Sequence, residues 1–137
     1  MDRKLLILQN DIGQVPQLAL FVEEVCETVG LDMATTMKLN LAIEESVVNV
    51  MSYAYPVGTV GDVSIEAQVN EEQLVFVISD RGYPFDPTTQ QEADTSLKAE
   101  QRPIGGLGIH LVRQIMDSID YEHKDGMNIL TLRKKVK

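Results

Sequence analysis

The sequence lacks the residues that mark several familiar protein classes. It has no tryptophan, few aromatic residues and a single cysteine, Cys26. One cysteine cannot form an intrachain disulfide, so the composition is typical of a reducing compartment. The two histidines, His110 and His123, do not have the spacing of metal ligands, and there is no HExxH motif. The sequence therefore predicts neither a disulfide-stapled fold nor a common zinc site.

Positive charge and long apolar runs are also scarce. The chain has 12 Lys and Arg against 21 Asp and Glu, a net charge of −9, which disfavours direct binding to nucleic acid. No apolar run approaches the roughly 20 residues that span a membrane. The run from Leu5 to Leu8 is too short for a signal peptide, so we expect a cytoplasmic protein. Hydrophobic residues make up 44% of the chain, which favours one globular domain over residues 1–137.

Hydrophobic periodicity predicts alternating strands and helices. Asp32 suits the N-cap of the second helix, Gly30 the end of the first, and Pro56 a stop after the second. Apolar residues at helical spacing predict helices over residues 16–29, 33–54 and 107–119. Alternating or short apolar runs predict strands over residues 3–9, 63–69, 74–78, 121–124 and 127–135.

The second helix carries an unusual polar pair. Glu45 and Asn49 are four residues apart, so they project from the same side of the helix. A separate stripe of apolar residues can face the core: Leu39, Ile43, Val47, Val50 and Met51. A carboxylate beside a phosphate can accept a proton from an attacking hydroxyl, and a carboxamide oxygen is a suitable ligand for Mg²⁺. The alternative is that both residues simply decorate the surface.

Two later segments can complete a nucleotide site. Asp80 ends an apolar strand and is followed by Gly82; a carboxylate there can accept a hydrogen bond from an amine such as that of adenine. The alternative for Asp80 is a residue that begins a turn. The Gly105-Gly106-Leu107-Gly108 run opens the third helix, where free N–H groups suit phosphates. Between them lies a polar stretch from Thr88 to Arg102, which is either a lid or surface disorder.

The order of these segments is more specific than any one of them. Glu-x-x-x-Asn on a helix, then Asp-x-Gly-x-x-Phe-Asp after a strand, then Gly-Gly-Leu-Gly-Ile-x-Leu-Val, resembles the N, G1 and G2 boxes of the GHKL (Bergerat-fold) ATPase superfamily. The Tyr53-Ala54-Tyr55-Pro56 exit from the helix looks most like bacterial anti-sigma factor serine/threonine-protein kinases. Walker A and Rossmann phosphate loops do not fit, because no Gly-Lys-Ser/Thr is present and the glycines come late.

The resemblance implies roles for individual residues. Glu45 matches the general base, Asn49 the Mg²⁺ ligand, and Asp80, with Gly82 beside it, the acid that reads the adenine amino group. Residues about 87–104 match the ATP lid, from which Lys98 or Arg102 would approach the γ-phosphate. The remaining matches are the phosphate contacts and a hydroxyl near the adenine: Gly105, Gly106, Leu107, Gly108 and Thr131.

The resemblance also implies a fold. The expected class is α+β: a two-layer α/β sandwich with a mixed, mostly antiparallel sheet of about five strands and three helices on one face. Family members are often homodimers, so a homodimer is expected as well.

The implied function is an ATP- and Mg²⁺-dependent kinase that phosphorylates a small anti-anti-sigma (STAS-type) protein and sequesters a sigma factor. One alternative is a non-catalytic ATP-binding module that switches partners. Another is a detached histidine-kinase-like ATPase domain, which ranks lower because His110 lies inside the third helix rather than before the domain.

Overall fold

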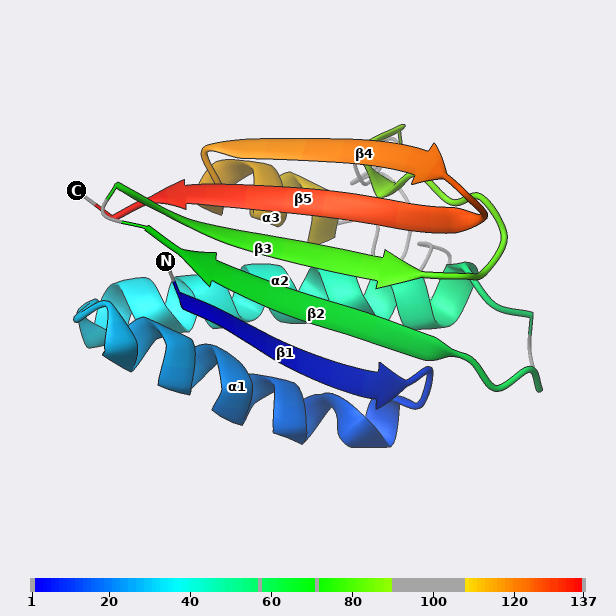
Figure 1. Cartoon of the computed structure of the whole chain (residues 1–137), viewed down its shortest axis with the longest axis horizontal. Helices are drawn as coiled ribbons and strands as arrows, with labels where there is room; N and C mark the ends of the chain where they lie inside the picture. The colour runs from blue at the N-terminus through cyan, green and yellow to red at the C-terminus, as the bar shows by residue number, and fades with distance from the viewer. Residues whose placement is uncertain (1, 57, 71, 90–107, 137) are drawn as a thin grey trace, which may run out of the picture.

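A computed structural model describes residues 2–56, 58–70, 72–89 and 108–136. These residues form a five-stranded sheet, three α-helices and two short 3-10 helices, Ile12–Gln14 and Pro87–Thr89. In chain order the main elements are β1 (Asp2–Gln9), α1 (Val15–Thr28), α2 (Met33–Tyr53), β2 (Asp62–Val69), β3 (Gln73–Asp80), α3 (Gly108–Ile115), β4 (Ser118–Lys124) and β5 (Met127–Lys135). Figure 1 shows the strands side by side with the helices behind them.

The sheet has the strand order β1-β2-β3-β5-β4, and all four pairings are antiparallel. The expected two-layer α+β fold is confirmed, but the described sheet is wholly antiparallel rather than mixed. The reason is that the β4–β5 hairpin inserts β5 between β3 and β4 (Figure 1). Three strands, β1, β3 and β4, run in the same direction, and no two of them are neighbours in the sheet.

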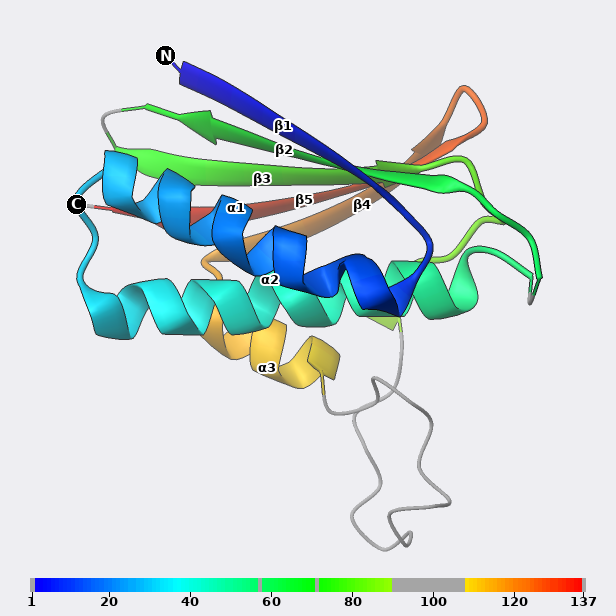
Figure 2. The same ribbon diagram turned by 90° about the horizontal axis from the view of Figure 1, so that it is seen from below.

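All three helices cover one face of the sheet, with α2 between α1 and α3 (Figure 2). The core fills the space between the layers, because alternate strand residues and one stripe of each helix are apolar. In α2 the buried stripe is the expected one, and Ser46 and Asn49 are buried beside it. The other large buried side chains come from both layers: Leu8, Leu18, Val22, Val25, Ile65, Leu74, Phe76, Ile78, Ile109 and Leu132.

The ends of α1 and α2 follow the local signals in the sequence. Gly30 adopts a φ of 71°, a left-handed conformation that glycine reaches without strain and that stops α1. The Asp32 side chain accepts a hydrogen bond from the Thr35 N–H at 2.7 Å and caps α2. The residue at which α2 begins is thus set by the local sequence.

The third helix is shorter than its apolar spacing suggests. It ends at Ile115, and Ile119, which we expected to be helical, lies in β4. The Asp117 N–H donates to the carbonyl of Arg133 on β5 at 2.8 Å, so sheet pairing begins where the helix stops. Ile119 packs against the core from the strand instead, because an apolar residue satisfies both patterns.

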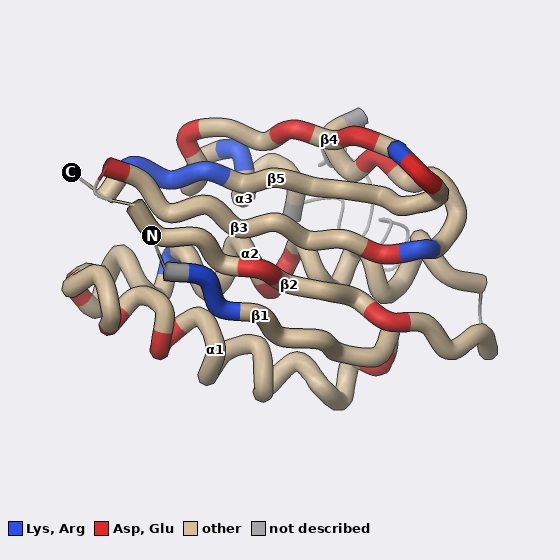
Figure 3. Tube along the Cα trace, viewed as in Figure 1, with Lys and Arg blue, Asp and Glu red and all other residues tan. Residues whose placement is uncertain are grey.

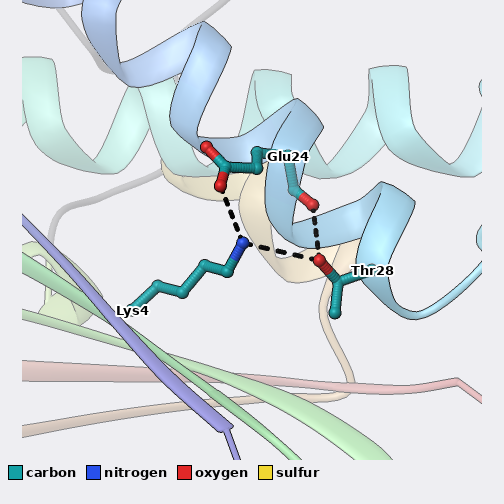
Figure 4. Close-up of polar contacts among 3 residues, drawn as sticks. All are labelled: Lys4, Glu24 and Thr28. Atoms are coloured by element: carbon teal, nitrogen blue, oxygen red, sulfur yellow. Dashed lines mark hydrogen bonds and ion pairs between the residues drawn. The ribbon is translucent and has the colours of Figure 1, made fainter.

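A polar contact ties the edge strand β1 to α1. Lys4 Nζ donates to Glu24 Oε1 at 2.8 Å and to Thr28 Oγ1 at 3.5 Å, as Figure 4 shows. The Glu24 side chain is 69% exposed, so this pair adds little stability. The contact orients the Lys4 side chain from β1 toward α1.

Candidate functional site

Asn49 is the clearest sign of a ligand site. It is 1% exposed, and neither its Oδ1 nor its Nδ2 has a hydrogen-bond partner within the described part of the chain. A buried carboxamide without partners is destabilising, and native proteins rarely keep one without a reason. A group bound from outside the chain would supply the missing partners.

A magnesium ion fits this position chemically. Mg²⁺ prefers oxygen donors and is commonly held by one or two protein groups together with water and phosphate oxygens. Within the described ranges, no cluster of three His, Cys, Asp or Glu residues could cage a metal alone. A single carboxamide oxygen from Asn49 matches a metal that shares its coordination sphere with a nucleotide.

Glu45 lies one turn before Asn49 on the same side of α2. Its side chain is half-buried, and burial raises the pKa of the carboxyl above its usual value; the neighbouring charge of Glu44 raises this pKa further. A raised pKa brings a carboxylate closer to the range in which it can accept a proton near neutral pH.

Asp80 ends β3 with its side chain buried on the helix-facing side of the sheet. Oδ1 accepts hydrogen bonds from the Gly82 N–H at 2.8 Å and from Asn128 Nδ2 at 2.9 Å. Burial raises the pKa of Asp80, although these two hydrogen bonds and the charge of His123 oppose the shift. Both hydrogen bonds made within the described ranges use Oδ1, which leaves Oδ2 for a ligand.

Asn128 is a site residue that the sequence did not reveal. It is 3% exposed and lies opposite Asp80 in the pairing of β3 with β5. Besides bonding Asp80, its Nδ2 donates to the Tyr83 carbonyl at 2.7 Å, and its Oδ1 accepts from the Phe85 N–H at 3.1 Å and from the Tyr121 hydroxyl. Asn128 therefore holds both Asp80 and the segment that follows it. One feature of the sequence could have identified it: Asn128 is a polar residue on the same face of the strand as the apolar residues Leu130 and Leu132.

Thr131 does not join this cluster. Along β5 the buried residues are Asn128, Leu130 and Leu132, so Thr131 projects from the opposite face of the sheet. It pairs with Val77 on β3 and is half-buried there. The structure thus separates Thr131 from Asp80.

Gly82 connects the end of β3 to the end of α2. A Cβ on Gly82 would lie 2.2 Å from the Ala54 carbonyl oxygen, and the Tyr83 N–H donates to that same oxygen at 2.7 Å. Only glycine allows the two backbones to approach this closely. The contact brings the segment after Asp80 against the last turn of α2, which follows the turn that carries Asn49.

Several predicted residues lie outside the described ranges. These are the lid after Thr89, with Lys98 and Arg102, and the glycine run at Gly105, Gly106 and Leu107. Gly108 is described and begins α3. Within the described ranges, the candidate site residues are Glu45, Asn49, Asp80, Gly82, Gly108 and Asn128.

The chain is similar in sequence to known proteins. The sequence profile of the family described as histidine kinase-like ATPase domain matches residues 8–134. A serine-protein kinase RsbW of Listeria monocytogenes is 25% identical over 115 residues, which cover 81% of this chain and 73% of the relative. A serine-protein kinase RsbW of Bacillus cereus is 31% identical over 96 residues, which cover 67% of this chain and 59% of the relative.

Two solved structures share the fold. The RsbU and RsbW domains of a Mycobacterium tuberculosis protein superpose with a TM-score of 0.69 at 15% identity, covering 98% of this chain and 32% of that one. The histidine kinase domain of a blue-light activated kinase from Erythrobacter litoralis gives a TM-score of 0.53 at 15% identity, covering 88% and 59%. At this identity the likeness establishes the architecture alone.

Proposed function

Because this chain belongs to the family of histidine kinase-like ATPase domains, we propose that it is an ATP-dependent protein serine/threonine kinase. The observation that carries the proposal is the buried, unpartnered carboxamide of Asn49, one turn from a carboxylate with a raised pKa. Relatives named serine-protein kinase support the reaction class, although this chain spans only 59% of the Bacillus cereus relative.

Separate residues are assigned to the adenine, to the metal ion and to the phosphates. Asp80 Oδ2 accepts a hydrogen bond from the adenine amino group, while Asn128 fixes the carboxylate through Oδ1. Asn49 Oδ1 would hold Mg²⁺, which would neutralise charge on the nucleotide phosphates. Phosphate contacts are assigned to Gly105, Gly106, Leu107 and Gly108, with Arg102 from the lid.

Glu45 acts on the acceptor. Its carboxylate takes the proton of a serine hydroxyl as the serine oxygen attacks the γ-phosphorus and ADP leaves. Partial burial raises the pKa of this carboxyl above its usual value, and the charge of Glu44 raises it further. The carboxylate, rather than the acid, is the active form, so activity should rise with pH through this pKa.

The finer biological role follows the resemblance. We infer that the acceptor is a serine on a small anti-anti-sigma (STAS-type) protein and that the unphosphorylated state of this partner decides whether the kinase sequesters a sigma factor. Phosphorylation adds negative charge at the interface and weakens the partner complex. We also infer a homodimer, supported by Leu5 and Ile7, which are 61% and 55% exposed on the edge strand β1.

The test uses the full chain, Mg-ATP and acceptor proteins recovered by pull-down and screened for phosphoserine by mass spectrometry. Glu45→Gln should bind ATP with unchanged affinity in calorimetry but lose phosphoryl transfer by about 100-fold or more. The matched control is Glu44→Gln on the same helix, which should stay active. Because the Glu44 charge raises the pKa of Glu45, this control should shift the acid limb of the pH–rate profile to lower pH.

Two outcomes would contradict the proposal. Transfer by Glu45→Gln at the wild-type rate would remove the base assignment. ATP binding without any phosphorylated partner would instead indicate the non-catalytic partner-switching module.

A further inference from the structure

A cavity of about 400 Å³ has a lining that contains none of the candidate nucleotide-site residues. It opens between the first half of α2, the end of α3 and the end of β5. We call it the lysine cleft, defined by two cationic residues, three aliphatic residues and one amide: Lys38, Lys134, Leu41, Leu111, Ile115 and Gln114. Its apolar floor with a few convergent polar groups is the usual composition of a binding site.

The position of Lys134 is unusual for a lysine. Strand alternation places it in step with Leu130 and Leu132, so its side chain starts from the helix-facing side of β5. It is half-buried, and it forms no ion pair with any carboxylate in the described ranges. A cation on the core-facing side of a strand normally has an anionic partner or reaches solvent through an opening.

Lys38 supplies the second positive charge of the cleft. Its charge lowers the pKa of Asp32, but this effect is smaller than that of the hydrogen bonds from Thr35 to the same carboxylate. Asp32 is committed to capping α2 through the Thr35 N–H at 2.7 Å. The lining of the lysine cleft thus holds two cations and no carboxylate. The Asp117 carboxylate, which lies beside the end of β5, accepts a hydrogen bond from the Lys135 N–H and forms no ion pair with Lys134 in the described ranges.

The apolar surface continues out of the cleft along α2. Met33, Met37 and Leu41 recur every four residues and therefore share one side of the helix. They are 80%, 66% and 43% exposed. Methionine is flexible and frequent on surfaces that accommodate protein partners. Met33 and Met37 lie outside the lining of the cavity, so the apolar surface extends beyond it and suits an extended or helical segment better than a small molecule.

We propose that the lysine cleft is a docking site for an acidic segment of a partner protein that also carries aliphatic side chains. A Glu or Asp of the segment lies between Lys38 and Lys134, its Leu or Ile residues pack on Leu111 and Ile115, and its next turn covers Met37. Charge favours such an occupant. The whole chain carries −9, whereas Figure 3 shows a run of Lys and Arg at the end of β5.

The docking site adjoins the proposed catalytic residue, because Leu41 precedes Glu45 by four residues, which is about 6 Å along the helix axis. The cleft lining does not include Glu45 or Asn49. The inference does not rest on phosphoryl transfer and is tested by binding alone. A partner held here would also present neighbouring residues to the middle of α2, which carries Glu45.

The test measures fluorescence anisotropy with the full chain and a labelled peptide of about 15 residues, with Leu at helical spacing and Glu elsewhere. Two matched peptides replace every Glu by Lys, or every Leu by Ser. The Glu-Leu peptide should bind most tightly. Lys134→Glu and Lys38→Glu should each weaken it about fivefold or more, because each reverses one contacting charge. Lys124→Glu, an equal charge change in the exposed β4–β5 hairpin, should have no effect.

Further readouts make the result decisive. Amide NMR shifts caused by the peptide should centre on residues 38–41 and 111–115, and ATP affinity should be unchanged in all three variants. Leu41→Ser, at an exposed position, provides a second test if a charge-reversal variant does not fold. The proposal is overturned if the Lys-Leu peptide binds equally well, if Lys124→Glu is as damaging as Lys134→Glu, or if the Glu-Leu peptide does not bind at about 1 mM.

Discussion

At the residue scale, we propose Asn49 as a ligand because of the hydrogen-bond partners that its amide lacks. Its amide is buried and has no hydrogen-bond partner in the described part of the chain. Burying such an amide costs free energy, whereas an apolar side chain of similar size would not have this cost. We predict that Asn49→Leu leaves the free energy of unfolding unchanged or raises it by about 1 kcal/mol. The same variant should weaken Mg-ATP binding at least about tenfold. Urea denaturation and calorimetry measure the two effects.

A matched control for this prediction lies on the same helix. Asn40 also has a buried oxygen without a partner, but it is nine residues earlier and therefore on the opposite side of α2. Asn40→Leu should leave Mg-ATP affinity unchanged. Equal loss of affinity in both variants, or strong destabilisation by Asn49→Leu, would contradict the assignment of Asn49 as a ligand.

Asp80 should make stability depend on pH. Because burial raises its pKa above the ordinary 3.8, the folded state binds more protons than the unfolded state once the pH exceeds that value. The contribution of Asp80 therefore falls as pH rises through this range. Asp80→Asn keeps an oxygen to accept from Gly82 and Asn128 but carries no charge. Relative to wild type, its melting temperature should improve between pH 4 and pH 7.

The same variant separates stability from binding. An asparagine Nδ2 at the place of Oδ2 presents a donor to the adenine amino group, so ATP binding should be lost while the protein is stabilised. A stability difference that does not change with pH would show that Asp80 is not the group that titrates.

At the scale of elements, the backbone after β3 contacts the backbone at the end of α2 at Gly82. We predict that Gly82→Ala destabilises the fold by about 2 kcal/mol, since the added Cβ would meet the Ala54 carbonyl oxygen at 2.2 Å and backbone must move. Denaturant unfolding measures the change. Gly13→Ala is the control, because its Cβ would meet only the Asp11 side chain, at 3.2 Å. Similar values for both would mean that the close approach is not a constraint.

The two faces of β5 explain why Thr131, which the resemblance placed near the adenine, lies away from Asp80. Residues 129–132 of β5 read Ile-Leu-Thr-Leu, which is apolar on both faces, so the sequence does not say which side meets the helices. Pairing with β3 decides it: Asn128 lies opposite Asp80 on the buried side, and Thr131 falls on the other. A one-residue change of register would exchange their positions.

At the scale of the whole molecule, Cys26 reports on cooperative unfolding. It is the only cysteine, it is fully buried in α1, and burial raises the pKa of its thiol above 9.0. We predict that Ellman's reagent does not modify the native protein within minutes, and that the rate in denaturant follows the global unfolding transition. Rapid modification under native conditions would show that α1 leaves the sheet without the rest of the fold unfolding.

No helix in the described ranges is long and apolar enough to cross a membrane. The described molecule is one sheet with all three helices on one face. Neighbouring exposed apolar residues recur on the edge strand β1 (Leu5, Ile7) and along α2 (Met33, Met37, Leu41). These are the surfaces that we assign to partner contacts.

The sequence by itself determined the local elements. Apolar periods, the Asp32 cap, Gly30 and Pro56 sufficed to place β1, α1, α2, β2 and β3, because each depends on neighbours in the chain. The order of the Glu45, Asp80 and glycine segments likewise indicated the family, which the matched profile over residues 8–134 confirms.

Only the tertiary structure decided how distant residues meet. Asp80 and Asn128 are 48 positions apart, and their contact exists because β5 returns between β3 and β4. Ile119 suits a helix or a strand until pairing with β5 selects the strand. The unpartnered state of Asn49 is likewise invisible in the sequence, because burial and hydrogen bonding depend on what the other elements place around a side chain.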